Sequence, residues 1–144
     1  MISSIPSKTV FHAIERTIKQ YRKFAQKNIS NAVNDITIDQ AMVLAFLEKH
    51  PDLTQKEIAA LVFKDNASMT RMINLMVTKK QLTRSINTLN RRRFNLEITL
   101  KGKQVLEKLG PIVQDNRKKA LDGVTEEELI QLESILEKIA SNCK

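Results

Sequence analysis

Residues 53–76 read LTQKEIAALVFKDNASMTRMINLM and predict two helices joined by a short turn. Thr54 and Glu57 have the spacing of a capping box, in which each side chain bonds the other residue's backbone N–H at a helix N-terminus. Apolar residues follow at helical spacing, at Ile58, Ala59, Leu61 and Val62. After a turn at residues 63–66, a second helix places Met69, Met72, Ile73 and Met76 on one face. This spacing is typical of a buried helix face, so we interpret the methionines as core residues and not as a metal or cofactor site.

The opposite face of the second helix is polar. It carries Ser68, Arg71 and Asn74, with Thr70 towards its margin. Small polar side chains near a helix N-terminus can enter the major groove of DNA, which is about 12 Å wide, and bond base edges or phosphates. The helix N-terminus itself favours phosphate. The two helices are therefore predicted to form a helix-turn-helix, with the second helix facing DNA.

The hydrophobic period changes from helical to two after residue 80. Phe94, Leu96, Ile98 and Leu100 alternate with Asn95, Glu97 and Thr99, which predicts a half-buried strand. Its expected partner is residues 82–86, joined to it through residues 87–93. Arg91, Arg92 and Arg93 lie at the far end of this hairpin, where an arginine can enter the minor groove. Two helices followed by a hairpin with a cationic tip are the element order of a winged helix-turn-helix.

Longer helices are expected before and after this segment. Residues 8–27 have a helical apolar period, and residues 28–38 are polar and are predicted to form a connection. A further helix is expected to begin near Asp39 as its N-cap and to end at His50, because Pro51 disfavours helix in the residue before it. The fold class is therefore mainly α with a small β-hairpin wing.

The helical period returns after Lys101 and Gly102 and runs towards Leu121. Gly110 and Pro111 are expected to interrupt and kink this helix. Thr125 to Glu128 form a second capping box, and a last amphipathic helix follows it.

The charge distribution points to a polyanionic partner. The 144 residues include 24 basic and 16 acidic side chains, a net charge of +8. Residues 51–103 carry +7 of this charge, residues 1–50 carry +3, and residues 104–144 carry −2. A basic run is most often a solvated face, but an asymmetry of this size favours a localised surface that binds a polyanion, either nucleic acid or a membrane surface. Aromatic residues are only 4%, too few for a platform that stacks single-stranded bases.

Other classes of function are poorly supported by the sequence. Cys143 is the only cysteine, which excludes an internal disulfide, and His12 and His50 lie in no cluster typical of a metal site. We found no glycine-rich phosphate loop or catalytic constellation, so we expect no enzyme activity, no cofactor and no metal. The N-terminus lacks a secretory signal and no stretch approaches the ~20 apolar residues of a membrane span. We therefore expect a cytoplasmic protein with no membrane partner.

Three motifs resemble the MarR (multiple antibiotic resistance regulator) family. Residues 53–59 look like the first helix of its helix-turn-helix, and residues 65–73 resemble its recognition helix. Residues 90–93, followed by residues 98–102, resemble its Asp-Arg-Arg wing signature and the Leu-Thr-x-x-Gly start of the next helix. Asn90 stands where the family commonly has Asp. Lys80 stands where a helix-ending Gly is common, so Lys80 is expected to adopt a left-handed conformation.

The resemblance implies a single domain over residues 1–144. Residues of about 39–103 would form the winged helix-turn-helix lobe, and about 8–27 and 104–144 would form dimerisation helices. The apolar faces of the end helices exceed what the lobe could cover, which independently favours a homodimer. The dimerisation residues predicted are Val10, Ile14, Leu129, Leu132, Ile135, Leu136 and Ile139.

The resemblance also implies a transcriptional regulator, most often a repressor, on a pseudo-palindromic double-stranded operator with half-sites about 34–36 Å apart. Arg92 aligns with the family arginine that reaches the minor groove. The DNA-binding residues predicted are Lys56, Asn66, Ala67, Ser68, Thr70, Arg71, Asn74, Arg91, Arg92 and Arg93. The alternative interpretation is a non-specific basic architectural or RNA-binding module, which a salt-resistant preference for one duplex would exclude.

A small aromatic or phenolic effector is a further implication of the resemblance. His12 and Tyr21 on the first helix are candidates for its pocket, although core or interface packing is the favoured interpretation of both.

Overall fold

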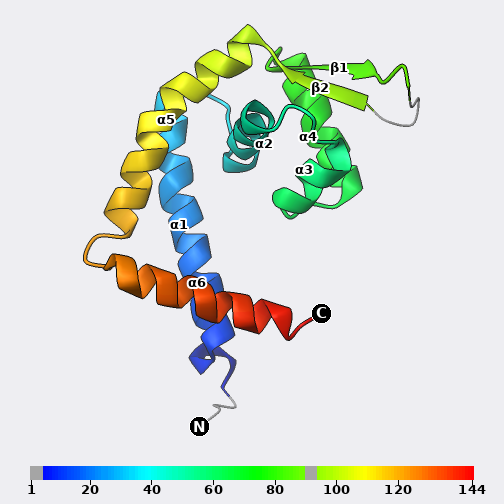
Figure 1. Ribbon diagram of the computed structural model, residues 1–144. Coiled ribbons are helices and arrows are strands. Elements are labelled where there is room, and N and C mark those ends of the chain that lie inside the picture. The colour runs from blue at the N-terminus through cyan, green and yellow to red at the C-terminus, as the bar shows by residue number, and fades with distance from the viewer. Residues whose placement is uncertain (1–4, 90–93) are drawn as a thin grey trace.

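The computed structural model describes residues 5–89 and 94–144. Long helices lie on one side of the molecule, and a lobe of shorter helices with a hairpin lies on the other (Figure 1). The elements in chain order are η1 (Pro6–Lys8), α1 (Val10–Ala32), α2 (Ile38–Lys49), α3 (Gln55–Leu61), α4 (Asn66–Thr78), β1 (Leu82–Ile86), β2 (Phe94–Ile98), α5 (Leu100–Ala120) and α6 (Glu126–Ser141). The fold is therefore mainly helical with a two-stranded wing, as predicted.

Side chains from the lobe form a continuous hydrophobic core. Val43 and Leu44 of α2, Ile58 of α3, and Met69 and Met76 of α4 are completely buried. Burying a side chain of this size contributes about 1.5–3 kcal/mol. The apolar face of α4 is therefore anchored in the lobe, which leaves its polar face to solvent and confirms that the methionines are core residues.

The two long helices α1 and α5 are joined to each other by packing and by a buried polar pair, and the lobe packs against both of them. Helices α1 and α5 lie side by side (Figure 1). Asn116 of α5 is buried, and the Nδ2 of Asn28 on α1 donates to its Oδ1 at 2.7 Å. Ile29 of α1 and Leu109 of α5 extend the lobe's core towards these helices. Helix α6 by contrast contributes no buried residue to the described chain.

Helix α1 runs five residues beyond its predicted end at residue 27, so the predicted connection over residues 28–38 was wrong for residues 28–32 and is confined to residues 33–37. Residues 28–32 are polar in sequence, but Ile29 is buried and Asn28 bonds Asn116 across to α5. These long-range contacts stabilise the last turn of the helix, and no local pattern reveals them.

Helix α2 begins at Ile38, and the prediction of Asp39 as its N-cap was wrong. The N-cap is Thr37, whose hydroxyl accepts from the backbone N–H of Gln40 at 3.1 Å while Gln40 Oε1 accepts from the N–H of Thr37 at 3.3 Å. The carboxylate of Asp39 is engaged instead by Arg22 of α1. The predicted capping boxes at Thr54 and Thr125 are both present.

Helix α5 is continuous through Pro111, so the predicted interruption was wrong, although the helix bends along its length (Figure 1). Pro111 removes one backbone hydrogen bond, and its ring crowds the carbonyl of residue 107 as well as the N–H and Cβ of the preceding residue. That preceding residue is Gly110, which has no Cβ. The glycine therefore relieves one of the clashes that would otherwise interrupt the helix at the proline.

Strands β1 and β2 form the predicted hairpin, which is antiparallel from Leu82 opposite Ile98 to Ile86 opposite Phe94. The second strand ends at Ile98 and does not reach Leu100 as the alternation predicted, because Thr99 caps α5. Leu82 and Leu96 face the core and are buried. Within residues 5–89 and 94–144, no helix has the length and apolar character required to span a bilayer. The same part of the chain holds no group of His, Cys, Asp and Glu side chains that could bind a metal ion.

Candidate nucleic-acid interface

The N-terminus of α4 is organised by Asp65. As the N-cap, its carboxylate accepts from the backbone N–H of Ser68 at 2.7 Å and from the Ser68 hydroxyl at 3.1 Å. These hydrogen bonds from Ser68 hold the pKa of Asp65 below its usual range. Asp65 is thus ionised near neutral pH and places a negative charge beside the positive end of the α4 dipole.

Arg71 is held in the same network. Its Nη2 donates to Ser68 Oγ at 3.1 Å, so the Ser68 hydroxyl accepts from Arg71 and donates to Asp65. Arg71 remains exposed, and the other N–H groups of its planar guanidinium are available for bidentate contact with guanine or phosphate. The predicted residues Ser68 and Arg71 therefore lie together in a chain of hydrogen bonds that orients the guanidinium.

Thr70 is tied into the lobe more firmly than its sequence position indicates. Its Oγ1 donates to the backbone oxygen of Asn66 at 2.9 Å and accepts from Nε2 of Gln55 at 2.9 Å. Gln55 lies on α3 and is not among the DNA-binding residues predicted from the sequence. The sequence does place Gln55 directly after the N-cap Thr54, and this position could have indicated its role, because side chains at the start of α3 lie where α3 meets α4.

The DNA-binding residues predicted on α3 and α4 are all exposed or half-buried. The exposed ones are Lys56, Asn66, Ala67, Arg71 and Asn74, and the half-buried ones are Ser68 and Thr70. The buried face of α4 is opposite, so the polar side chains of α4 and Ala67 form one surface, termed the α4 polar face (residues 66, 67, 68, 70, 71 and 74). Arg91, Arg92 and Arg93 lie outside the described residues.

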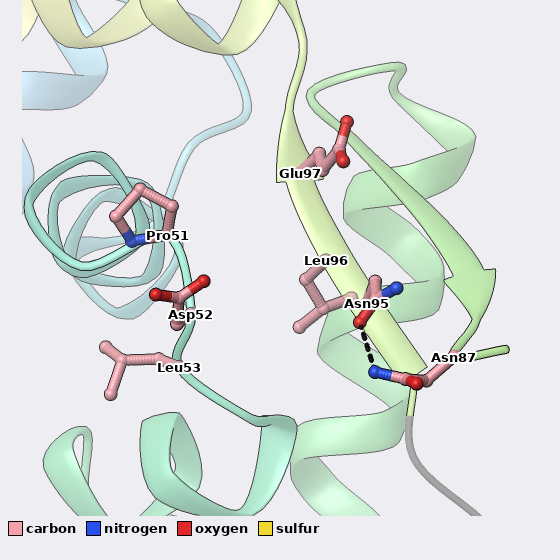
Figure 2. Close-up of a pocket in the computed structure, with 7 residues that line it drawn as sticks. All are labelled: Pro51, Asp52, Leu53, Asn87, Asn95, Leu96 and Glu97. Atoms are coloured by element: carbon pink, nitrogen blue, oxygen red, sulfur yellow. Dashed lines mark hydrogen bonds between the residues drawn. The ribbon is translucent and has the colours of Figure 1, made fainter. Parts of the chain in front are cut away.

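Figure 2 shows how strand β2 of the wing and Asn87 face the connection between α2 and α3. Asn87 Nδ2 donates to Asn95 Oδ1 at 3.1 Å across the hairpin, and the Leu89 N–H donates to Asn87 Oδ1 at 2.9 Å. A cleft between wing and connection is lined by Pro51, Asp52, Leu53, Asn87, Asn95, Leu96 and Glu97. The two asparagines stabilise the end of the hairpin that precedes the arginine run.

A compact junction connects α4, the wing and α5. Lys80 ends α4 in the predicted left-handed conformation, with φ of 64°. The Thr99 hydroxyl donates to the Lys80 backbone oxygen, and the Thr99 N–H donates to the Gln81 oxygen at 3.1 Å. Thr99 also caps α5 by accepting from the Gly102 N–H at 3.1 Å. One residue therefore positions the wing relative to both helices.

Charged side chains attach the lobe to α1. The carboxylate of Asp39 lies 2.7 Å from Arg22 Nη2 of α1 and 3.1 Å from Lys64 Nζ in the α3–α4 turn. Burial by itself raises the pKa of Asp39, but the hydrogen bonds and charges of Arg22 and Lys64 outweigh it, so this pKa lies below its ordinary value. The ion pairs connect the helix-turn-helix to the first long helix.

The residues predicted for other roles lie apart from this surface. His12 is exposed and Tyr21 is half-buried on α1, and neither lines the cleft of Figure 2. Of the predicted dimerisation residues, the exposed ones are Val10, Leu132, Ile135 and Leu136, and the half-buried ones are Ile14, Leu129 and Ile139. A single chain thus leaves a large apolar surface on α1 and α6 in contact with solvent.

The comparisons with known proteins agree on one family. The protein-family model described as "MarR family" matches residues 34–93. The chain is 31% identical over 105 residues to the HTH-type transcriptional repressor MdtR of Bacillus subtilis. The matched residues make up 73% of this chain and 68% of the relative. Its fold is similar to that of a Cys-to-Ser mutant of Escherichia coli MarR complexed with operator DNA, with a TM-score of 0.81, 24% identity, and 90% and 92% of the two chains covered.

A second similar structure is that of Bordetella bronchiseptica BpsR, described in terms of regulation of its DNA binding by 6-hydroxynicotinic acid. Its TM-score is 0.85 at 20% identity, and the match covers 96% of this chain and 97% of BpsR.

Proposed function

The chain belongs to the MarR family of DNA-binding transcriptional regulators, and from this premise we propose that it is a dimeric repressor of one operator, released from DNA by a small molecule. Regulators of this family are not enzymes. We further propose that residues 1–144 act as one MarR-type domain in the cytoplasm, with about 39–103 as the DNA-binding lobe. The observation that carries the proposal is the α4 polar face, where Asp65 and Ser68 orient an exposed Arg71.

Sequence-specific reading is favoured by the order of this network. A flexible basic surface binds phosphates of any sequence, whereas base recognition requires donors held in a defined geometry. Ser68 accepts from Arg71 and donates to Asp65, so the guanidinium direction is set before DNA arrives. Preorganisation of this kind lowers the entropy cost of binding.

The test is selection of duplexes from a random-sequence pool, followed by affinity measurements on the selected and a scrambled duplex. Arg71→Ala is expected to cost about 1–3 kcal/mol per half-site and to relax preference at one symmetric pair of positions. Arg117→Ala, which removes an exposed arginine near the end of α5, is the matched control and should leave that preference unchanged. Equal weakening by Arg71→Ala on both duplexes would instead indicate the non-specific basic module.

Dimerisation is supported by the uncovered apolar surface on α1 and α6. Leu132 and Ile135 of α6 are 51% and 53% exposed, and α6 has no buried residue in the described chain. Apolar patches of this extent on a soluble chain mark interaction surfaces. A two-fold dimer would present two lobes to a pseudo-palindromic operator.

Ligand release is supported by the similarity to BpsR, whose DNA binding is described as regulated by a hydroxylated aromatic acid. A ligand shifts the operator affinity only by its difference in affinity for the two conformations. We propose an aromatic or phenolic effector, with His12 and Tyr21 as candidate pocket residues. Titration of a panel of such acids into the complex with the selected duplex should lower its affinity, and a panel without effect would contradict this class of effector.

A further inference from the structure

Gln55 is the first residue of α3, and its side chain crosses to the recognition helix. Its Nε2 lies 2.9 Å from Thr70 Oγ1, fifteen residues further along the chain. Thr70 is half-buried, whereas Asn66 and Asn74, one turn before and after it on α4, are exposed. Gln55 therefore lies against the middle of the α4 polar face, between side chains that are open to solvent.

The direction of this hydrogen bond follows from the chemistry of Thr70. A threonine hydroxyl has one proton to donate, and here it goes to the backbone oxygen of Asn66 at 2.9 Å. Thr70 Oγ1 can then only accept from Gln55, so the Gln55 amide must present its nitrogen to Thr70. The orientation of the amide is thus determined by the network, although nitrogen and oxygen have nearly the same shape.

The remaining capacity of the two side chains differs. Thr70 has no proton left to donate to a base, because its only one is used within α4. Gln55 keeps its amide oxygen and a second N–H, and within the described part of the chain Thr70 is the only hydrogen-bond partner of its side chain. An acceptor and a donor on one amide are the groups that bind N6 and N7 of adenine in the major groove.

We propose that Gln55 is a specificity-determining residue that reads an adenine in each half-site, and that Thr70 is the positioning residue that holds its amide for this contact. The proposal rests on the proposed function as a sequence-specific DNA-binding protein. It assigns base recognition to α3 as well as to α4, and it gives Thr70 a role within the protein.

The experiment compares duplexes selected from a random pool by the wild type and by Gln55→Met, a neutral change of similar length without polar groups. Gln55→Met is expected to lose preference for adenine at one symmetric pair of positions and to bind the wild-type duplex roughly 10-fold more weakly per half-site. Gln104→Met, at an exposed glutamine on α5, is the matched control and should select the wild-type sequence. Thermal unfolding of each variant shows whether it is folded.

A second substitution tests the chemistry of the contact. Gln55→Glu keeps an acceptor and loses the donor, and a carboxylate accepts from N4 of cytosine. It should therefore shift the preference at the same positions from adenine to cytosine. A merely structural Gln55 would change stability or overall affinity without exchanging one base for another.

Thr70 is tested by a pair of variants. Thr70→Val removes the hydroxyl and should weaken the adenine preference at the Gln55 positions, whereas Thr70→Ser retains the hydroxyl and should restore it. Valine and serine variants with the same adenine preference would overturn the positioning role.

The outcomes separate the inference from the function on which it rests. If the wild type selects no sequence, the proposed function fails and the inference fails with it. If the wild type selects a sequence and Gln55→Met selects the same one, only the inference is wrong. Equal weakening by Gln55→Met on selected and scrambled duplexes would also overturn it, because it would assign Gln55 to phosphate.

Discussion

Gly102 is so closely packed that a larger residue there is predicted to lower the stability of the protein. It is the third residue of α5 and is buried against the junction that joins α4 to the wing. A Cβ added to Gly102 would lie 2.4 Å from the backbone oxygen of Gln81 and 2.8 Å from Cγ2 of Ile98. The backbone conformation of Gly102 is accessible to any residue, so the glycine is needed for space.

Gly102→Ala is therefore expected to displace the junction. Overpacking of this kind typically costs about 1–3 kcal/mol. The Gln81 oxygen also accepts from the Thr99 N–H, and loss of that bond adds about 1 kcal/mol. Alanine is better than glycine in a helix by about 1 kcal/mol, which offsets part of the cost. We expect a net loss of about 2 kcal/mol in the free energy of unfolding.

The measurement is urea unfolding followed by circular dichroism, at one protein concentration because the apparent stability of a dimer depends on concentration. Lys101→Ala, at the exposed neighbouring position of the same helix, is the matched control. Its unfolding free energy should stay within about 0.5 kcal/mol of the wild type, because an exposed change from one good helix former to another costs little. If Gly102→Ala were as stable as Lys101→Ala, the close approach of Gln81 would not constrain the junction and the reasoning would be wrong.

Three further predictions concern assembly, charge and the wing. Light scattering of the full chain should give twice the chain mass of 16.5 kDa, and a mass of 16.5 kDa would contradict the dimer. Removal of residues 125–144 should give monomeric or aggregated protein that does not bind the operator. Asp39→Asn should lower the unfolding free energy by about 1–2 kcal/mol near pH 7. Because the folded-state pKa of Asp39 is depressed, this difference should shrink as the pH falls below the ordinary value of 3.8, and a constant difference down to acid pH would exclude the ion pairs as its cause. Arg92→Ala should weaken operator binding more than Arg91→Ala or Arg93→Ala and should reduce the preference for narrow A·T-rich flanks. Each lost phosphate contact should lower the slope of log affinity against log salt concentration by about one unit. Three variants with the same affinity and the same flank preference would leave only a non-specific cationic tip.

Local patterns in the sequence were sufficient to predict much of the secondary structure of the lobe and the start of α6. The capping boxes at Thr54 and Thr125 and the pairing of residues 82–86 with the strand that begins at Phe94 are as predicted. Capping bonds join residues three positions apart, and strand alternation follows the two-residue repeat of the pleat, so a short stretch of chain carries all the necessary information. The left-handed conformation of Lys80 was expected from the family resemblance, because a helix-ending Gly is common at this position.

The predictions that were wrong concern residues whose structure depends on contacts with distant parts of the chain. Residues 28–32 look like a polar connection, yet Asn116 and the core extend α1 through them. Asp39 is a good N-cap by residue type, but two cations compete for its carboxylate and Thr37 caps the helix.

The same division holds for the candidate site. Composition and periodicity alone determined that the polar residues of 66–74 lie opposite a buried methionine face, because both follow from the helical repeat. The pairing of Gln55 with Thr70 and the close approach of Gly102 to Gln81 were decided only by tertiary structure. Such contacts depend on the angle at which two elements meet, and that angle is set by the packing of the whole core, which no local stretch of sequence encodes.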